Sequence, residues 1–385
     1  MPLLTSEQRD IQALARDFAR GELRPHTARW DADRVLDEDV FAKLAEMGFM
    51  GMRVPEEHGG LGLDLRTYLV ALEELAWGDA AVGLAVAIHN GPVAHLLRRH
   101  GTEEQRARWL PRLAEGGVGA FALSEPGAGS DPSGMETRAV REGDAWILTG
   151  GKRWVTNGRR ASLVIVFARV DEPDGGTGAF LVEPGATGYN SGLSEATLGL
   201  RASETVPVSL DGVRADGILG EPGRGLTYAL EALDVGRVGI AVQAVGVGRA
   251  AMEHALAYAL EREQFGRPIA EFGAIQAKLA EMAARVAAGR ALAFEAADLL
   301  EVSAGSRAGR GGVTAAAAVA KLVASAGATW VADEAIQIFG GYGYMKDFPV
   351  EKLLRDAKGA EIYEGTNEIM RHVIAREVLR ESRAG

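Results

Sequence analysis

The spacing of hydrophobic positions divides the chain into three stretches. In residues 1–117, apolar side chains such as Ile11, Leu14 and Phe18 recur every three or four positions, which is the period of an amphipathic helix. Ser6 has a side chain typical of a helix N-cap and is expected to cap the first helix. We predict an N-terminal α-helical domain over this stretch.

The pattern changes in residues 118–225, where Gly and Pro separate short apolar runs at 146–148, 163–167, 179–182 and 206–210. Runs of this length between turn residues are typical of β-strands. No helical pattern alternates with them, which argues against a parallel βαβ sheet. The prediction is a middle antiparallel β-domain, either a barrel or a sandwich.

Long helical patterns return in the last stretch, at 226–263, 275–300 and 313–338. Abundant Ala and Gly would let these helices approach one another closely. Four long helices with short connections predict a C-terminal four-helix bundle. The expected fold class is therefore α+β, mostly α. Its three domains are expected at 1–117, 118–225 and 226–385.

Composition and charge narrow the functional classes. The 385 residues include 42 Lys and Arg against 53 Asp and Glu, so the formal net charge is −11. A nucleic-acid-binding protein needs a basic face, and an acidic chain is also poorly suited to binding an anionic membrane through bulk charge. We expect no nucleic-acid partner.

Cysteine is absent, which excludes disulfides, a thiolate nucleophile and Cys-ligated zinc or iron–sulfur centres. The N-terminus lacks a basic segment followed by an apolar run, the pattern of a secretory signal. No 18 consecutive apolar residues occur, and even the alanine-rich segment 313–331 contains Lys321. We expect a cytoplasmic protein without membrane insertion.

Several common chemistries have no motif here. The sequence contains no G-x-G-x-x-G after a strand and no G-x-x-x-x-G-K-[ST], which disfavours Rossmann-type nicotinamide binding and P-loop ATP chemistry. It also lacks H-E-x-x-H and G-x-S-x-G, and its seven histidines do not have the spacing of metal ligands. No metal site is expected.

Three glycine-rich segments, 121–131, 337–344 and 362–369, mix Gly with hydroxyl, amide or acidic side chains. Such loops expose backbone N–H groups that can bind phosphates or a polar heterocycle. In sequence and in order, these segments resemble those of the acyl-CoA dehydrogenase family, and the resemblance covers essentially the whole chain. Segment 233–241 and the C-terminal third resemble short-chain, butyryl-type members in particular.

This resemblance implies an enzyme that dehydrogenates acyl-CoA thioesters to trans-2-enoyl-CoA. In the family, a base removes the α-proton, N5 of bound FAD accepts the β-hydride, and an electron-transfer flavoprotein then takes the electrons. The base position corresponds to Glu364, whose backbone N–H would hold the thioester oxygen together with a hydroxyl of FAD. Such a base must be poorly solvated, so burial is expected to raise its pKa toward neutrality.

Other interpretations of this position are open on the residues alone. Glu364 can be a surface-loop acid, or an acid favoured by the helix dipole near Thr366, which can itself be the N-cap of the last helix. Some family members carry the base on a bundle helix instead, where this chain has Asp234 and Arg237. Because Glu364 is present at the expected position, we assign it as the base.

The resemblance also assigns ligand contacts. The residues expected to contact FAD within the subunit are Phe121, Leu123, Ser124, Gly129, Ser130, Trp154, Val155, Thr156, Thr366 and Glu368. Those expected to reach the FAD of a neighbouring subunit are Arg262, Phe265, Gln337, Gly340 and Gly341. The expected substrate contacts are Ser130, Asp234, Arg237, Tyr363 and Gly365. Among these, Trp154 would pack on the flavin ring and the Thr156 hydroxyl would hydrogen-bond N5.

Simpler structural roles exist for many of these residues. Segment 121–131 can be a glycine-rich turn, Trp154 a core aromatic and Arg262 a charge at a helix end. Asp234 and Arg237 can form an i,i+3 salt bridge. The two glycines of the second cross-subunit segment can end a helix.

Assembly and chemistry carry further expectations. Two motifs would serve a neighbour's FAD, so we expect a homo-oligomer, a dimer of dimers. Gly273 stands where family members often carry a Gln that contacts FAD across the dimer interface, so that contact is in doubt. The alternative functions are an acyl-CoA oxidase or flavin monooxygenase of the same fold, or a non-catalytic acyl-CoA-binding scaffold. Acyl chain length is expected to depend on the pocket near residues 86–97.

Overall fold

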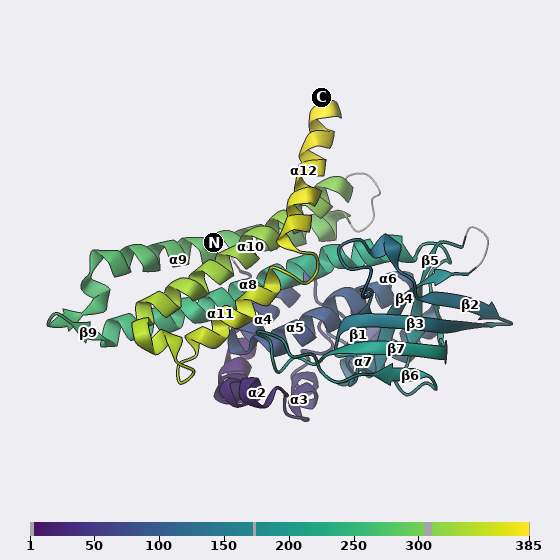
Figure 1. The fold of residues 1–385 in the computed structure, drawn as a ribbon, viewed down its shortest axis with the longest axis horizontal. Coiled ribbons are helices and arrows are strands. Elements are labelled where there is room, and N and C mark those ends of the chain that lie inside the picture. Colours follow the sequence, from purple (N-terminus) through teal and green to yellow (C-terminus); the bar gives the residue numbers. More distant parts are fainter. Residues whose placement is uncertain (1–3, 172–174, 304–309, 385) are drawn as a thin grey trace.

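The computed structural model describes residues 4–171, 175–303 and 310–384. Figure 1 shows an elongated molecule in which N-terminal helices and a β-sheet lie along one side of a bundle of long helices. The sheet lies at one end of the molecule, and a two-stranded hairpin forms the opposite end. This order of helices, sheet and helices confirms the predicted fold class.

The N-terminal region is a cluster of short helices around two buried ones. Its elements are α1 Ser6–Phe18, η1 Ala19–Leu23, η2 Arg24–His26, α2 Thr27–Asp33, α3 Val40–Glu46, η3 Glu56–His58, α4 Leu65–Gly78, α5 Ala80–Ile88, η4 His89–Val93, α6 Ala94–His100 and α7 Glu103–Ala114. The assignment of Ser6 as the first N-cap is wrong. Thr5 caps α1 in a reciprocal capping box with Gln8, which places Ser6 inside the helix.

The middle region forms one curved eight-stranded sheet. Its strands are β1 Gly119–Ala122, β2 Arg138–Glu142, β3 Ala145–Thr156, β4 Leu163–Val170, β5 Thr177–Val182, β6 Tyr189–Ser191, β7 Thr205–Arg214 and β8 Gly217–Leu219, with a short turn η5 Pro132–Gly134. The order is β6-β7-β3-β2-β4-β5-β8, with β1 also paired to β4. Most pairs are antiparallel, whereas β4 runs parallel to both β1 and β2. Alternation of turns and strands in the sequence does not reveal these two parallel pairings, because each joins strands that are not consecutive.

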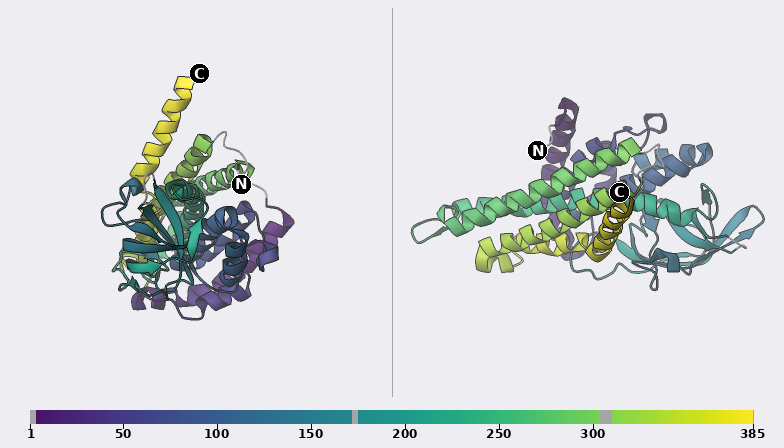
Figure 2. Two further views of the ribbon diagram at one scale, coloured as in Figure 1. Left: turned by 90° about the vertical axis from the view of Figure 1, so that its right-hand side faces the viewer. Right: turned by 90° about the horizontal axis from the view of Figure 1, so that it is seen from above.

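The C-terminal region is a helical bundle. Its elements are α8 Gly225–Glu261, β9 Glu263–Gln264, β10 Arg267–Pro268, η6 Ile269–Glu271, α9 Gly273–Ser303, α10 Arg310–Phe339, η7 Gly340–Tyr344, α11 Val350–Ala360 and α12 Asn367–Ala384. Helices α8, α9 and α10 are long, and the shorter α11 completes the bundle beside α8 and α10. Figures 1 and 2 show that α12, in yellow, stands away from the body of the molecule.

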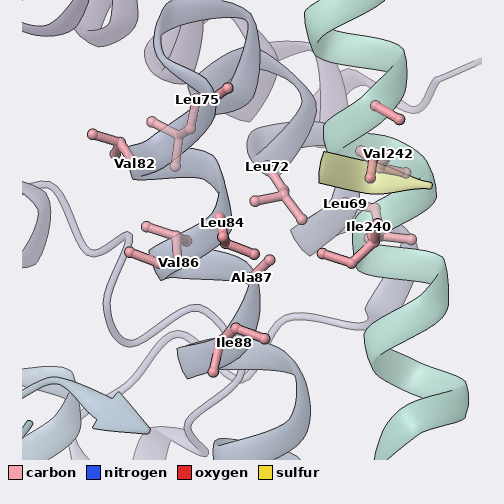
Figure 3. Packing of buried hydrophobic residues seen from close by; sticks show 14 of the residues in the cluster. Leu69, Leu72, Leu75, Val82, Leu84, Val86, Ala87, Ile88, Ile240 and Val242 are labelled. Atoms are coloured by element: carbon pink, nitrogen blue, oxygen red, sulfur yellow. The ribbon is translucent and has the colours of Figure 1, made fainter. Parts of the chain in front are cut away.

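The core between the N-terminal helices and the bundle is almost entirely aliphatic. Figure 3 shows Leu69 and Leu72 of α4, Leu84 of α5, and Ile240 and Val242 of α8 packed together. All five side chains are buried. This core fixes α5 against α8, and the two helices form neighbouring walls of the cavity described below.

Two helical segments have the length and composition of a membrane span, Ala80–His100 and Gly311–Tyr344. In their most apolar windows, 94% of the first segment and 56% of the second are buried inside the protein. Core helices of globular proteins commonly meet the same criteria, so this is weak evidence for a membrane span. In the second segment, Lys321 is fully buried and hydrogen-bonded to other parts of the chain.

Candidate active site

A cavity of about 1370 Å³ opens where α5, β1, β3, α8 and the turn between α11 and α12 meet. The structure brings most of the predicted site residues to its wall. The predicted residues that line it are Phe121, Leu123, Ser124, Gly129, Ser130, Trp154, Thr156, Asp234, Arg237, Tyr363, Glu364, Gly365 and Thr366. Aliphatic side chains that were not named as site residues also line the wall, including Leu84, Ile88, Leu230 and Val235. The cavity therefore combines apolar surface with hydroxyl groups and with many charged side chains, among them Arg98, Arg153 and Arg355.

Glu364 lies in the turn between α11 and α12 with a backbone φ of +55°, and Gly365 follows at +93°. Consecutive positive-φ residues bend the chain sharply and direct the Glu364 side chain away from α12 into the cavity wall. Among the described residues, the buried Oε2 atom of Glu364 has no hydrogen-bond partner. Glu364 is thus neither a surface-loop acid nor part of the first turn of α12.

Burial raises the pKa of Glu364 from 4.5 to about 7, while the positive charges of Arg237 and Lys321 oppose this rise. The carboxylate is therefore close to half-ionised at neutral pH. This is the condition under which a general base works best near that pH.

Gly236 on α8 makes room for this carboxylate. A Cβ atom at that position would overlap Oε2 of Glu364 and lie 3.0 Å from its Cδ atom. Gly236 lies in segment 233–241, but its role was not predicted from the sequence. The available signal was a glycine inside a long helix, where Gly costs about 1 kcal/mol relative to Ala and needs a packing reason.

Hydrogen bonds from α8 hold the turn that carries Glu364. Arg237 Nε donates to the Glu364 carbonyl at 3.5 Å, and its Nη1 donates to Asp234 Oδ1 at 2.8 Å. The expected i,i+3 salt bridge is therefore present, and both of its members also line the cavity. The Tyr363 hydroxyl donates to the buried amide of Gln243 at 2.7 Å. Gln243, the one polar side chain between Val238 and Gly248 of α8, was missed from the sequence.

On the side of the cavity opposite Glu364, segment 121–131 continues from β1 and is held in place by a buried ion pair. Lys152 of β3 is fully buried and donates to Leu123 O at 3.0 Å and to Glu125 Oε1 at 2.6 Å. Burial lowers the pKa of Lys152 to about 8, and the carboxylate of Glu125 opposes this shift. Backbone N–H groups of Glu136 and Thr137 donate to Glu125 as well. Neither Glu125 nor Lys152 was identified from the sequence as holding this segment.

Trp154 is the most unusual residue of the β-domain wall. Its φ is +56°, at an irregularity of β3 between Lys152 and Val155, and 54% of its surface is exposed. The interpretation of Trp154 as a core aromatic is therefore wrong, since its ring faces the cavity region. The next side chain, Val155, is buried in the β-domain core instead and does not line the cavity.

The residues predicted to serve a neighbouring subunit lie elsewhere. Arg262, Gly340 and Gly341 line a separate hollow, where the Arg262 guanidinium lies 5.7 Å from the Tyr342 ring centre. Phe265, with φ +54° and 93% exposure, lies at the β9–β10 hairpin. Gln337 is exposed on α10. None of these residues lines the main cavity of the same chain.

Two further positions have open surroundings. Glu368 is exposed on α12, where it pairs with Arg371 at 3.0 Å, and it does not line the cavity. Gly273 begins α9, and no atom of the described residues lies within 4 Å of where its Cβ would stand. A side chain is therefore sterically possible at position 273. Because this chain has Gly there, it lacks the side-chain amide that a Gln would extend outward.

Comparison with known proteins gives the class. Models of the N-terminal, middle and C-terminal domains of acyl-CoA dehydrogenase match residues 5–117, 120–213 and 223–379 in that order. The chain belongs to the acyl-CoA dehydrogenase family of oxidoreductases.

Relatives match over nearly their whole length. An acyl-CoA dehydrogenase of Bacillus subtilis (strain 168) is 42% identical over 381 residues, which cover 98% of this chain and 99% of the relative. The mitochondrial short-chain specific acyl-CoA dehydrogenase of Bos taurus is 41% identical over 379 residues, covering 97% of this chain and 90% of the relative.

Solved structures share the fold. Butyryl-CoA dehydrogenase from Megasphaera elsdenii superposes with a TM-score of 0.93 at 38% identity, covering 98% and 99% of the two chains. A chain in a structure described as the electron transferring flavoprotein of Acidaminococcus fermentans gives 0.93 at 40% identity, covering 99% and 100%. A glutaryl-CoA dehydrogenase from Mycobacterium smegmatis in complex with FADH2 gives 0.90 at 32% identity, covering 97% and 95%.

Proposed function

We propose that this protein is an FAD-dependent dehydrogenase of short-chain acyl-CoA thioesters, with Glu364 as the catalytic base. The observation that carries the proposal is the buried, unpartnered Oε2 atom of Glu364 in a cavity that also presents Trp154 and Thr156. A buried carboxylate without a partner is costly, so its retention in a cavity wall supports a chemical role.

The cavity fits a flavin together with an acyl chain. An exposed Trp154 ring offers a flat apolar surface, and the hydroxyls of Ser124, Ser130 and Thr156 offer hydrogen bonds to a polar heterocycle. FAD, when bound, supplies the acceptor for the β-hydrogen and its electron pair. The aliphatic residues Leu84 and Ile88 would surround the acyl chain.

Glu364 would take the α-proton of the bound thioester. Its pKa of about 7 makes it a much stronger base than an exposed glutamate, yet leaves a large share ionised at neutral pH. Its backbone N–H would donate to the thioester oxygen and stabilise negative charge as the proton leaves. Arg237 and Tyr363 hold the turn that sets both groups in place.

The decisive test is Glu364→Gln, with Glu361→Gln as the matched control. Glu361 lies on the same turn but pairs with Lys358 at 2.9 Å and does not line the cavity. The first variant should remain yellow and bind acyl-CoA, while substrate-dependent flavin bleaching falls roughly 10²–10⁴-fold, the usual contribution of a general base. Near-normal bleaching would refute the assignment. The control should bleach like the wild type.

Two alternatives give different outcomes. For an oxidase or monooxygenase, the reduced protein would react rapidly with oxygen, whereas we expect slow reaction with oxygen and fast transfer to an electron-transfer flavoprotein. A non-catalytic acyl-CoA-binding scaffold would purify without flavin absorbance. Stopped-flow oxidation and the absorption spectrum of the purified protein separate all three.

The assembly we propose is a homo-oligomer, a dimer of dimers. Arg262, Phe265 and Gln337 are remote from the cavity of their own chain, so contact with FAD would require a neighbouring copy. An exposed aromatic on a protruding hairpin is suited to such an interface. A monomeric holoprotein in light scattering would contradict this. Location in the cytoplasm stays a prediction.

We expect the chain-length preference to depend on the side chains of the cavity wall. Within the predicted region 86–97, Ile88 and His95 line the cavity. We propose a preference for short acyl chains, as the names of the short-chain relatives suggest. A panel of straight and branched acyl-CoAs, compared by bleaching rate, should show the highest rate with a short straight chain.

A further inference from the structure

Lys321 lies in the middle of α10 and is fully buried, although it carries an ammonium group. Its Nζ donates to the Gly365 carbonyl at 2.7 Å and to Asn367 Oδ1 at 3.1 Å. Ser325, one turn later on α10, donates to the same Asn367 oxygen at 3.1 Å. A buried lysine is expensive unless its donors are used, and here they are used on the turn that follows Glu364.

These contacts span the turn. Gly365 directly follows Glu364, and Asn367 begins α12, so one ammonium holds both ends of the segment that leads out of the Glu364 position. The positive φ of Glu364 is unfavourable for a residue with a side chain and needs surrounding contacts to persist, whereas Gly365 adopts its positive φ readily. Lys321 provides these contacts from a rigid helix.

The charges around Lys321 connect it with Glu364. Burial is the largest influence and lowers the pKa of Lys321 to about 7, while Glu364, Glu361 and Glu368 raise it and Arg237 lowers it. In the other direction, Arg237 and Lys321 both favour the ionised form of Glu364. These are the charged groups that face the two residues from α8, α10, the turn and α12.

We propose that Lys321 is a positioning residue for the base: its ammonium holds the turn after Glu364, and its positive charge favours the ionised carboxylate. This inference rests on the proposed function. It assigns a chemical task to a buried cation that does not line the cavity.

The variants Lys321→Met and Lys321→Gln test whether the charge of Lys321 favours the ionised form of Glu364. Both remove this charge, and the Gln variant keeps a donor for Gly365. With the charge gone, the midpoint of the acidic limb of kcat/KM against pH should rise by about one pH unit in both variants. Because the limb moves, the loss of rate should be largest near pH 6 and smallest near pH 9. Ser325→Ala, which removes a neutral donor to the same Asn367 oxygen, should leave the limb in place.

A second test does not depend on catalysis. A double-mutant cycle with Lys321→Met and Glu364→Gln measures the coupling free energy between the two side chains from urea unfolding. The coupling should be present near pH 7, where the Lys321 ammonium and the ionised Glu364 carboxylate coexist, and should vanish at pH 5, where Glu364 is protonated. An acidic limb that stays in place in both lysine variants, or a coupling that is zero near pH 7, would overturn the inference. If the Met variant does not fold, the Gln variant takes its place in both measurements.

Flavin bleaching of the wild-type protein by acyl-CoA distinguishes failure of this inference from failure of the proposed function. Wild-type protein that no acyl-CoA bleaches would contradict the dehydrogenase proposal itself. Wild-type protein that bleaches, alongside lysine variants with unchanged limbs, would contradict only the role of Lys321. Equal loss of rate at every pH would indicate a purely structural residue and would also overturn it.

Discussion

Two glutamates of this protein have buried carboxylate oxygens near buried lysines, and they are partnered differently. Glu125 accepts directly from Lys152 at 2.6 Å and from two backbone N–H groups. Lys321 donates instead to neutral oxygens of the turn after Glu364, and Oε2 of Glu364 is left without a partner among the described residues.

The pKa values move in opposite directions as a result. Burial acts to raise the pKa of both carboxyl groups. In Glu125, hydrogen bonds from the Glu136 N–H and from Lys152 outweigh burial and hold the pKa below its ordinary value. In Glu364 burial prevails and the pKa rises to about 7. Hydrogen bonds to the ionised form therefore decide whether a buried carboxyl group has a lowered pKa and holds a segment in place, or has a raised pKa suited to a general base.

In this comparison, we expect the largest change in stability when the ion pair between Lys152 and Glu125 is broken. Lys152→Met would leave Glu125 buried without its cation, so the free energy of unfolding should fall by about 3–5 kcal/mol. Urea unfolding measures the loss. Adding Glu125→Gln to the same chain removes the stranded charge and should recover part of it. A loss below about 1 kcal/mol would mean that the pair does not fasten segment 121–131.

A smaller effect concerns how stability depends on pH. The folded pKa of Glu364 lies above its unfolded value, so the folded state binds more protons between pH 4.5 and about 7. Its contribution to stability is present at low pH and is lost as the pH rises through this window. Relative to Glu364→Gln, the wild type should therefore lose roughly 2–3 kcal/mol between pH 4.5 and 8, since one pKa unit corresponds to about 1.4 kcal/mol.

Unfolding of the wild type and Glu364→Gln in parallel at both pH values measures that difference. Glu125 should show the opposite sign, because its depressed pKa makes its contribution disappear as the pH falls. A wild type and variant that respond equally to pH would show that Glu364 is not buried as described.

The smallest effect tests the space in which the unpaired carboxylate lies. Gly236→Ala places a methyl group against Oε2 of Glu364, so bleaching should slow roughly tenfold or more while FAD is retained, because the base is displaced. Gly239→Ala is the matched control on the same helix, where the nearest atoms would lie at an ordinary 3.8 Å. Equal rates in the two variants would remove Gly236 from the description of the site.

Much of the fold followed from the chain itself. Helical periods, strand-length runs between glycines, and long alanine-rich patterns predicted the helix–sheet–helix order that the structure shows. The N-cap went to Ser6 rather than Thr5 because both residues can cap, and only the reciprocal bond with Gln8 decides between them. The parallel pairings of β4 depend on which strands meet in space, which local patterns do not encode.

By itself, the sequence determined the family resemblance, the position of Glu364 and a part of the cavity lining. Only the tertiary structure decided that Oε2 of Glu364 is buried, that Gly236 makes room for it, and that Lys321 and Arg237 oppose its protonation. Arg237 reaches Glu364 from 127 positions away in the chain. The pKa of a carboxyl group depends on the atoms packed around it, and these come from helices that meet only when the chain folds.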